Sequence, residues 1–147
     1  MTSTASRHMA KKMRAPVILN HNMLVKDVMQ TDLITAKFDT SLVDTIAILK
    51  EKGISGLVVL DNIGEFVGVV SALDIFKAVN EGDRVENLVV DDVMTPFTIT
   101  IFHDANIADA ALTMMENNIH RLVVTESPTS KKPVGIVTST DLINNLI

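Results

Sequence analysis

The sequence contains no cysteine, tryptophan or tyrosine, and five phenylalanines are its only large aromatic residues. Without cysteine the chain has no disulfide, no thiolate nucleophile and no cysteine-ligated zinc or iron–sulfur cluster. That absence fits a cytoplasmic protein, since disulfides are rare in that compartment, and we predict a cytoplasmic location. With 47% hydrophobic residues but few rings, the predicted core is aliphatic. No apolar run approaches the roughly 20 residues that cross a bilayer, so we predict no membrane partner.

Basic residues are scarce beyond the first 24 positions. Residues 25–147 contain nine of the 13 lysines and arginines and all 18 acidic residues, which gives this part of the chain a net charge of −9. A surface this acidic repels phosphate backbones, so we do not expect nucleic acid as a partner. The sequence also has no Gly-rich phosphate loop with its lysine and no nucleophile paired with a base. We therefore predict that the chain is not an enzyme.

The chain contains two copies of one unit. VKDVM at 25–29 returns as VDDVM at 90–94, an offset of 65 residues. GVVSALD at 68–74 returns as GIVTSTD at 135–141, an offset of 67, so two residues have been inserted in between. We place repeat one at residues 23–80, a linker at 81–89 and repeat two at 90–147. Residues 1–22 form a leader that derives in part from cloning, because its SRHM resembles a vector remnant.

Both copies predict the same order of secondary structure. Ser41 and Asn106 each precede a helical pattern and have an acid three positions on, as N-cap residues do. Gly53 and Asn118 end these helices and belong to the two residue types that most readily take the left-handed C-cap conformation. Two short strands and a second helix follow in each copy. We predict an α+β fold of two β-α-β-β-α repeats around a pseudo-two-fold axis, because a unit of under about 60 residues buries too little surface alone.

The repeated phrase G-h-h-[S/T]-x-x-D, where h is apolar, has two interpretations. Ser71 with Asp74, and Thr138 with Asp141, match the capping pattern of a strand-to-helix junction, which needs no ligand. The same junction exposes unpaired N–H groups and a partial positive charge, which attract phosphate. A nearby carboxylate can accept hydrogen bonds from two vicinal sugar hydroxyls. The spacing alone leaves both interpretations open.

Together these features resemble the tandem CBS domain pair, named after cystathionine β-synthase. The resemblance rests on the DVM openings, the capped helices, GLVVLD, RLVVTE and the final phrase in both copies. It implies an adenosyl ligand, either AMP, ADP or ATP or else S-adenosylmethionine, and no obligatory cofactor. It also implies that Asp74 and Asp141 hold ribose hydroxyls, with Ser71 and Thr138 near phosphate. The remaining implied ligand contacts, largely through backbone at the adenine, are Ile34, Thr35, Thr98, Ile99 and Thr100, with Ser139 beside Thr138.

The stretch NNIHRLVV occurs only in the second copy, whereas the first has Ser55 and Gly56 at the His-Arg positions. It resembles nucleotide-sensing relatives, such as the γ subunit of AMP-activated kinase, in which a His-Arg pair meets phosphates. The resemblance implies a phosphate role for Arg121 and His120, although an isolated arginine before a strand is otherwise ordinary solvated surface. Because the first copy departs from this pattern, we expect the two clefts to differ in charge.

We therefore predict a non-catalytic regulatory module that holds an adenosyl ligand in the clefts between its repeats. The alternative is a structural dimerisation module with degenerate, empty clefts. Pairs of this family commonly meet through their helices, so the resemblance implies a homodimer, and we expect a further, unknown effector protein. The apolar faces of the helical patterns at 42–49 and 107–115 are consistent with that use, although internal packing also accounts for them. His103 and Asp104 lack further ligands, and we predict no metal site.

Overall fold

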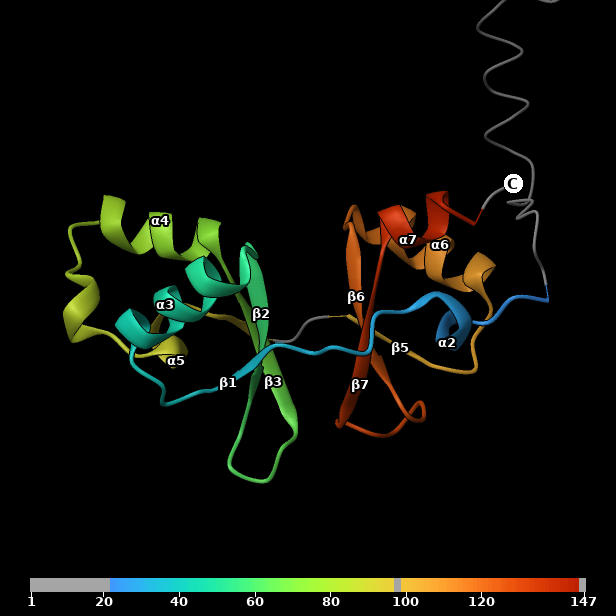
Figure 1. The fold of residues 1–147 in the computed structure, drawn as a ribbon, viewed down its shortest axis with the longest axis horizontal. Coiled ribbons are helices and arrows are strands. Elements are labelled where there is room, and N and C mark those ends of the chain that lie inside the picture. The colour runs from blue at the N-terminus through green and yellow to red at the C-terminus, as the bar shows by residue number, and fades with distance from the viewer. Residues whose placement is uncertain (1–21, 97–98, 146–147) are drawn as a thin grey trace, which may run out of the picture.

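Each repeat supplies three strands of one sheet, and the two sheets face each other across the middle of the molecule, with helices on the outer sides (Figure 1). The structure is a computed structural model that describes residues 22–96 and 99–145. Residues 1–21 of the predicted leader and the predicted site residue Thr98 lie outside these ranges. The predicted α+β fold of two related repeats is confirmed.

The two sheets share the topology of three strands, and the first sheet has β4 as an additional edge strand. The first has the strand order β1 (Thr35–Lys37), β2 (Gly56–Leu60), β3 (Phe66–Ser71) and β4 (Thr95–Pro96), and the second has β5 (Thr100–Phe102), β6 (Arg121–Thr125) and β7 (Pro133–Thr138). In both, the first strand runs parallel to the second and the second antiparallel to the third. The helices are α2 (Val25–Val28), α3 (Leu42–Lys52), α4 (Ala72–Asn80), the 3₁₀ turn η1 (Val85–Asn87), α5 (Val90–Val93), α6 (Ile107–Asn117) and α7 (Ser139–Ile143).

The long helix of each repeat begins and ends as its sequence predicts. Ser41 Oγ accepts from the Asp44 N–H at 3.1 Å before α3, and Asn106 Oδ1 accepts from the Asp109 N–H at 2.9 Å before α6. Gly53 and Asn118 then end the helices with φ of 63° and 51°, in the left-handed region. The inward faces of both helices pack on their sheets, so these apolar positions belong to the two cores.

The core of each repeat contains an apolar residue from the opening segment of the other repeat. Val25 of α2 is fully buried in the core of repeat two, and its N–H donates to the Ala105 carbonyl at 2.8 Å. Val90 of α5 is fully buried in the core of repeat one, and its N–H donates to the Thr40 carbonyl at 2.9 Å. The DVM openings are therefore exchanged between the repeats, and each sheet depends on the other's leading segment.

After each short helix the chain crosses from one sheet to the other over a glycine. The glycine of GVVS is Gly68, where an added methyl carbon would lie 2.5 Å from the Thr95 carbonyl oxygen. The glycine of GIVT is Gly135, where it would lie 2.7 Å from the Met29 sulfur and 2.8 Å from the Gln30 carbonyl oxygen. Real side-chain carbons do not approach backbone this closely, so the repeated glycine is required by the crossing chain.

Candidate functional site

Two aspartates cap the helices that follow β3 and β7. Asp74 Oδ2 accepts from the Ser71 N–H at 2.8 Å and from the Ser71 hydroxyl at 3.0 Å. Asp141 Oδ2 accepts from the Thr138 N–H at 2.8 Å and from its hydroxyl at 2.9 Å. Each hydroxyl oxygen in turn accepts from the N–H of its aspartate, which completes a capping box. The capping interpretation of the repeated phrase is confirmed, and it engages Oδ2 of each carboxylate.

Each carboxylate also receives a hydrogen bond from the residue that follows a DVM helix. Thr95 Oγ1 donates to Asp74 Oδ1 at 2.9 Å. Gln30 Nε2 donates to both oxygens of Asp141, at 3.3 and 3.4 Å. Thr95 and Gln30 are equivalent at the 65-residue offset, so the two corners share one geometry with different donors. The sequence-based prediction missed both residues, although their shared place after VKDVM and VDDVM was visible.

The crossing segments connect each aspartate to the first strand of the other repeat. Gln30 forms a backbone bridge with Ile136 of β7 in the second sheet. Five residues later along the chain, Thr35 pairs with Val58 in the first sheet. The other crossing segment is arranged in the same way: β4 pairs with β3 in the first sheet, near Asp74, and Thr100 pairs with Val123 in the second sheet. The predicted residues can therefore be grouped by the crossing chain that links them along the sequence: Asp141 and Thr138 with Ile34 and Thr35, and Asp74 and Ser71 with Ile99 and Thr100.

The Arg121 side chain extends from repeat two to repeat one. Its backbone pairs with Thr138 in the second sheet, yet a methyl carbon added at Gly56 would lie only 3.3 Å from Arg121 Nη1. Gly56 pairs with Ser71 in the first sheet, so the guanidinium lies beside the corner that leads to Asp74. Arg121 is exposed, and within residues 22–96 and 99–145 no carboxylate forms an ion pair with it. The guanidinium is therefore available to an anion.

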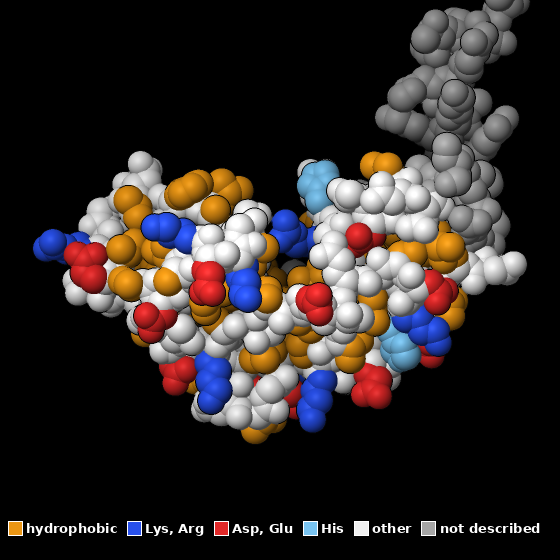
Figure 2. Space-filling model, viewed as in Figure 1, with side chains coloured by type: hydrophobic (Ala, Val, Ile, Leu, Met, Phe, Trp, Pro, Cys, Tyr) orange, Lys and Arg blue, Asp and Glu red, His pale blue; other side chains and the backbone are white. Residues whose placement is uncertain are grey.

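A cavity of about 110 Å³ lies between the sheets, and Ser55, Gly56, Ser71 and Arg121 contribute its polar lining. Val58 and Val123, the partners of Thr35 and Thr100, also line it. Figure 2 shows a hollow between the two halves of the molecule, with basic side-chain atoms at its edge. Pockets for small molecules usually measure about 300–1,000 Å³, so this cavity alone is too small for a nucleoside.

His120 and Ser139 lie elsewhere. Both line an apolar groove between α6 and α7, and neither is among the residues around the cavity between the sheets. The two residues are joined through the backbone, since the Ser139 N–H donates to the His120 carbonyl at 2.8 Å. The structure thus brings Arg121 toward the predicted cleft and turns the exposed His120 toward the helices.

Asp104 forms an ion pair with the exchanged opening, and His103 lies beside it. Lys26 Nζ lies 2.9 Å from Asp104 Oδ1, and His103 Nδ1 lies 3.6 Å from the same oxygen. The hydrogen bond from Lys26 holds the pKa of Asp104 below its ordinary value, and the same bond raises the pKa of Lys26. Across the residues that the structure describes, no three His, Cys, Asp or Glu side chains gather as a metal site would require. Nor is any helix in those ranges long and apolar enough to cross a membrane.

The sequence matches the CBS domain family model twice, over residues 25–81 and 90–147. The chain belongs to the CBS domain family. Protein MJ1426 of Methanocaldococcus jannaschii is 32% identical over 85% of this chain and 92% of its own length. The CBS pair also matches larger enzymes, but it spans only 25% of the L-aspartate semialdehyde sulfurtransferase of Methanocaldococcus jannaschii and 24% of the homoserine O-acetyltransferase of Methanosalsum zhilinae.

Solved CBS pairs share this fold. The CBS domain pair of protein MJ0100, in complex with 5′-methylthioadenosine and S-adenosyl-L-methionine, is 30% identical with a TM-score of 0.72, over 83% of this chain and 94% of that one. CBSX2, a CBS-pair protein of Arabidopsis thaliana solved in complex with AMP, is 32% identical with a TM-score of 0.72, over the same shares. The ligands of these two pairs all contain adenosine.

Proposed function

We propose that this CBS pair is a non-catalytic regulatory module that binds an adenosyl ligand in the two clefts between its repeats. The observation behind the proposal is the set of hydrogen bonds that the two aspartates accept. Each keeps its helix cap with Oδ2, while Asp74 Oδ1 accepts a hydrogen bond from an alcohol, the Thr95 hydroxyl, at 2.9 Å. A ribose hydroxyl is an alcohol as well, so a ribose can take the place of Thr95 without disturbing the cap.

The grouping of residues supports one cleft for each aspartate. In the first cleft, Asp74 and Ser71 hold the ribose, and the crossing chain that ends at Ile99 and Thr100 borders the adenine. In the second cleft, Asp141 and Thr138 take the ribose, with Ile34 and Thr35 in the equivalent position. Adenosine is the part shared by the ligands of MJ0100 and CBSX2, and it is the part that these residues recognise in the proposal.

Arg121 makes the first cleft selective for phosphate. Its guanidinium lies beside Gly56 and thus near Ser71, without a carboxylate partner in the described ranges. A guanidinium forms strong, charge-assisted hydrogen bonds with phosphate oxygens. AMP, ADP or ATP therefore suits the cleft of Asp74, whereas the cleft of Asp141 suits S-adenosylmethionine or adenosine itself.

The second candidate function is a structural dimerisation module with empty clefts. It is favoured by the small cavity of about 110 Å³ between the sheets and by the neutral donors that already occupy both carboxylates. For a nucleoside to bind, the crossing chains that hold Thr95 and Gln30 must move aside. The two candidate functions therefore differ in whether an adenosyl compound displaces these contacts.

Calorimetry with adenosine, AMP and S-adenosylmethionine separates the two candidates. In the binding module, Asp74→Asn and Asp141→Asn each remove a charged acceptor and weaken ligand binding at their own cleft by about 1.5–3 kcal/mol. Asp27→Asn is the matched control, because Asp27 caps α2 by accepting from the Leu24 N–H at 2.9 Å and is not among the proposed ligand contacts. Absence of heat with all three compounds, or unchanged affinity in both cleft variants, would favour the structural module.

The same proposal includes assembly and location. We propose that the CBS pair acts in the cytoplasm as a homodimer and passes the state of its clefts to an effector protein. Light scattering over micromolar concentrations tests the homodimer, and a monomeric mass throughout that range would reject it.

A further inference from the structure

The two chains that cross between the sheets differ in charge. At the 65-residue offset, the first crossing chain has Asp32 where the second has Phe97. Asp32 is exposed, and within residues 22–96 and 99–145 no base forms an ion pair with its carboxylate. No hydrogen bond engages that side chain in the same ranges either. Asp32 thus carries a negative charge that neither the helix caps nor the proposed ligand contacts use.

Asp32 lies in the part of the first crossing chain that borders the proposed second cleft. Two residues before it, Gln30 donates to both oxygens of Asp141, at 3.3 and 3.4 Å. The residues proposed to border the adenine begin two positions after it. The Leu33 N–H donates to the Thr31 carbonyl at 2.8 Å, which closes a tight three-residue turn around Asp32. Because a residue spans at most about 3.6 Å, Asp32 lies within about 7 Å of Gln30 along the backbone, and a ribose held at Asp141 lies close to its charge.

The residues around the two clefts give them different formal charges. The first cleft combines Asp74 with Arg121, which gives a formal charge of 0. In the second cleft the residue equivalent to Arg121 is Gly56, which brings no base. Figure 2 shows acidic side-chain atoms on the face that the first crossing chain spans in Figure 1, seen from the same side. With one negative charge each from Asp141 and Asp32, the second cleft has a formal charge of −2.

We propose that Asp32 is a specificity-determining residue, which makes the second cleft prefer a positively charged adenosyl ligand and disfavour a phosphate. This inference rests on the proposed function, because it needs the ribose at Asp141. In S-adenosylmethionine the positive sulfonium sulfur is bonded directly to the 5′ carbon of the ribose, so holding the ribose places that charge beside the acidic cleft. Coulomb's law for charges about 10 Å apart, with a dielectric between that of a protein surface and that of water, predicts roughly a 2- to 15-fold effect on affinity. The phosphate of AMP meets a repulsion of similar size.

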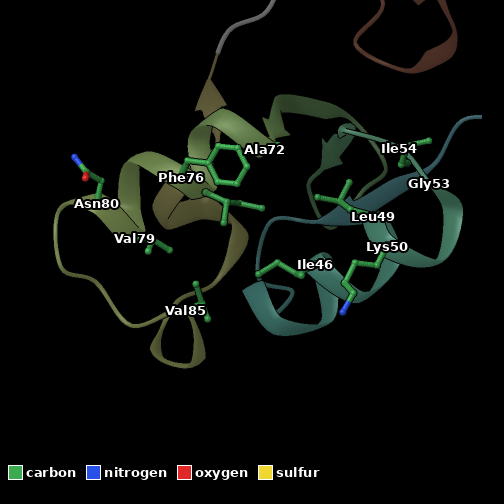
Figure 3. A pocket seen from close by; sticks show the side chains of 11 residues that line it. Ile46, Leu49, Lys50, Gly53, Ile54, Ala72, Phe76, Val79, Asn80 and Val85 are labelled. Atoms are coloured by element: carbon green, nitrogen blue, oxygen red, sulfur yellow. The ribbon is translucent and has the colours of Figure 1, made fainter.

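A hollow of ligand size also lies outside the clefts. It measures about 740 Å³ between α3 and α4, and Figure 3 shows its lining side chains, which are apolar except for Lys50 and Asn80. None of the residues that line it is acidic, so this hollow has no carboxylate to hold ribose hydroxyls or to attract a sulfonium. Ligand binding that responds to the charge of Asp32 therefore reports on the second cleft.

Two ligands that differ in charge but little in shape test the proposal. S-adenosylmethionine has one methyl group more than S-adenosylhomocysteine and a positive sulfur in place of a neutral one. Calorimetry measures both in the full chain with Asp74→Asn, which weakens the first cleft. We expect S-adenosylmethionine to bind more tightly, and Asp32→Asn to lower its preference over S-adenosylhomocysteine roughly 2- to 15-fold, with a smaller change at high salt. Asp39→Asn is the matched control, since Asp39 is exposed and follows β1, at the end away from the crossing chain.

Two further measurements separate the charge of Asp32 from damage to the fold. Asp32→Glu keeps the charge and should keep the preference, whereas Asp32→Asn should strengthen the binding of AMP relative to adenosine by a similar factor. Loss of the preference in Asp32→Glu, an equal loss in Asp32→Asn and Asp39→Asn, or equal affinity for the two sulfur compounds before Asp32 is changed would overturn the inference and leave adenosyl binding in place. If neither compound binds to any of these proteins, wild type included, the proposed function falls together with the inference.

Discussion

Replacing Arg121 with alanine tests the proposal that this CBS pair binds a phosphorylated adenosine more tightly than adenosine itself. The guanidinium lies beside Gly56 in repeat one, although its backbone belongs to repeat two. Removing it takes away a positive charge near Ser71 and leaves the Asp74 cap intact. We therefore expect Arg121→Ala to weaken the binding of AMP and to leave the binding of adenosine unchanged.

The expected loss of AMP affinity depends on how exposed the Arg121 side chain is. Hydrogen bonds to charged groups contribute about 1.5–3 kcal/mol, which corresponds to roughly a 10- to 150-fold change in affinity. Arg121 is exposed, so water and salt screen the contact and place the loss at the lower end of that range. We expect AMP to bind about 10- to 30-fold more weakly to Arg121→Ala, with a smaller difference between wild type and variant at high salt.

Calorimetric titration of AMP and adenosine into both proteins measures this preference. Arg84→Ala is the matched control, because Arg84 is an exposed arginine outside the clefts that pairs with Glu86 at 3.2 Å. A double-mutant cycle with Asp74→Asn and Asp141→Asn then locates the phosphate. Because the guanidinium lies near Ser71, we expect Arg121 to couple to Asp74 and not to Asp141. Equal affinity of the wild type for AMP and adenosine would refute the reasoning, and Arg121 would then be ordinary solvated surface.

Three further predictions concern the parts that hold the clefts in place. Gly135→Ala pushes a methyl group against Met29 and the crossing chain, and we expect a loss of about 1–3 kcal/mol in urea denaturation, where a change below ~0.5 kcal/mol would mean that the chain crosses loosely. Val25→Ala leaves a cavity in the core of repeat two, so hydrogen exchange should accelerate in β6 and β7 before β2 and β3, and the reverse order would contradict the exchanged openings. Lys26→Met removes the partner of Asp104. Because the folded-state pKa of Asp104 is lowered and that of Lys26 is raised, the pair stabilises the fold at intermediate pH. Its contribution fades as pH falls through the pKa of Asp104 or rises through that of Lys26, so the stability difference between wild type and variant should shrink at both extremes, and a pH-independent difference would contradict the pairing.

Local physical chemistry made much of the fold predictable. The caps at Ser41 and Asn106, and the left-handed residues Gly53 and Asn118, depend on hydrogen bonds within four or five residues of chain. The strand-to-helix junction at Asp74 is equally local. Repetition of these signals at one offset then predicted two related units, and the structure confirms that organisation.

Contacts between distant residues were not predictable in the same way. Nothing near Val25 in the sequence indicates that it is buried in repeat two, since its apolar side chain fits either core. The hydrogen bonds of Thr95 and Gln30 to the aspartates depend on where the crossing chains lie. The sequence shows a glycine in each repeat, but only the structure shows that the crossing chain packs against it. His120 was grouped with Arg121 because the resemblance implies a His-Arg pair at phosphate, yet His120 lies just before β6, which begins at Arg121, and it lines the groove between α6 and α7. The functional roles of all these residues remain predictions.

The exchange of opening helices has a consequence for how such a chain can arise. If the chain were divided at the linker, the core of the first half would lack Val90 and the core of the second half would lack Val25, because each of these residues lies on the other side of the cut. A single-repeat ancestor with this geometry would complete itself by pairing with an identical chain, each subunit placing its opening helix on the other's sheet. Gene duplication and fusion would then turn a swapped dimer into one polypeptide, without a new interface having to evolve. After fusion each copy could mutate independently. Positions 56 and 121 are equivalent in the two repeats, so an arginine at one and a glycine at the other is a difference that a dimer of identical chains could not have.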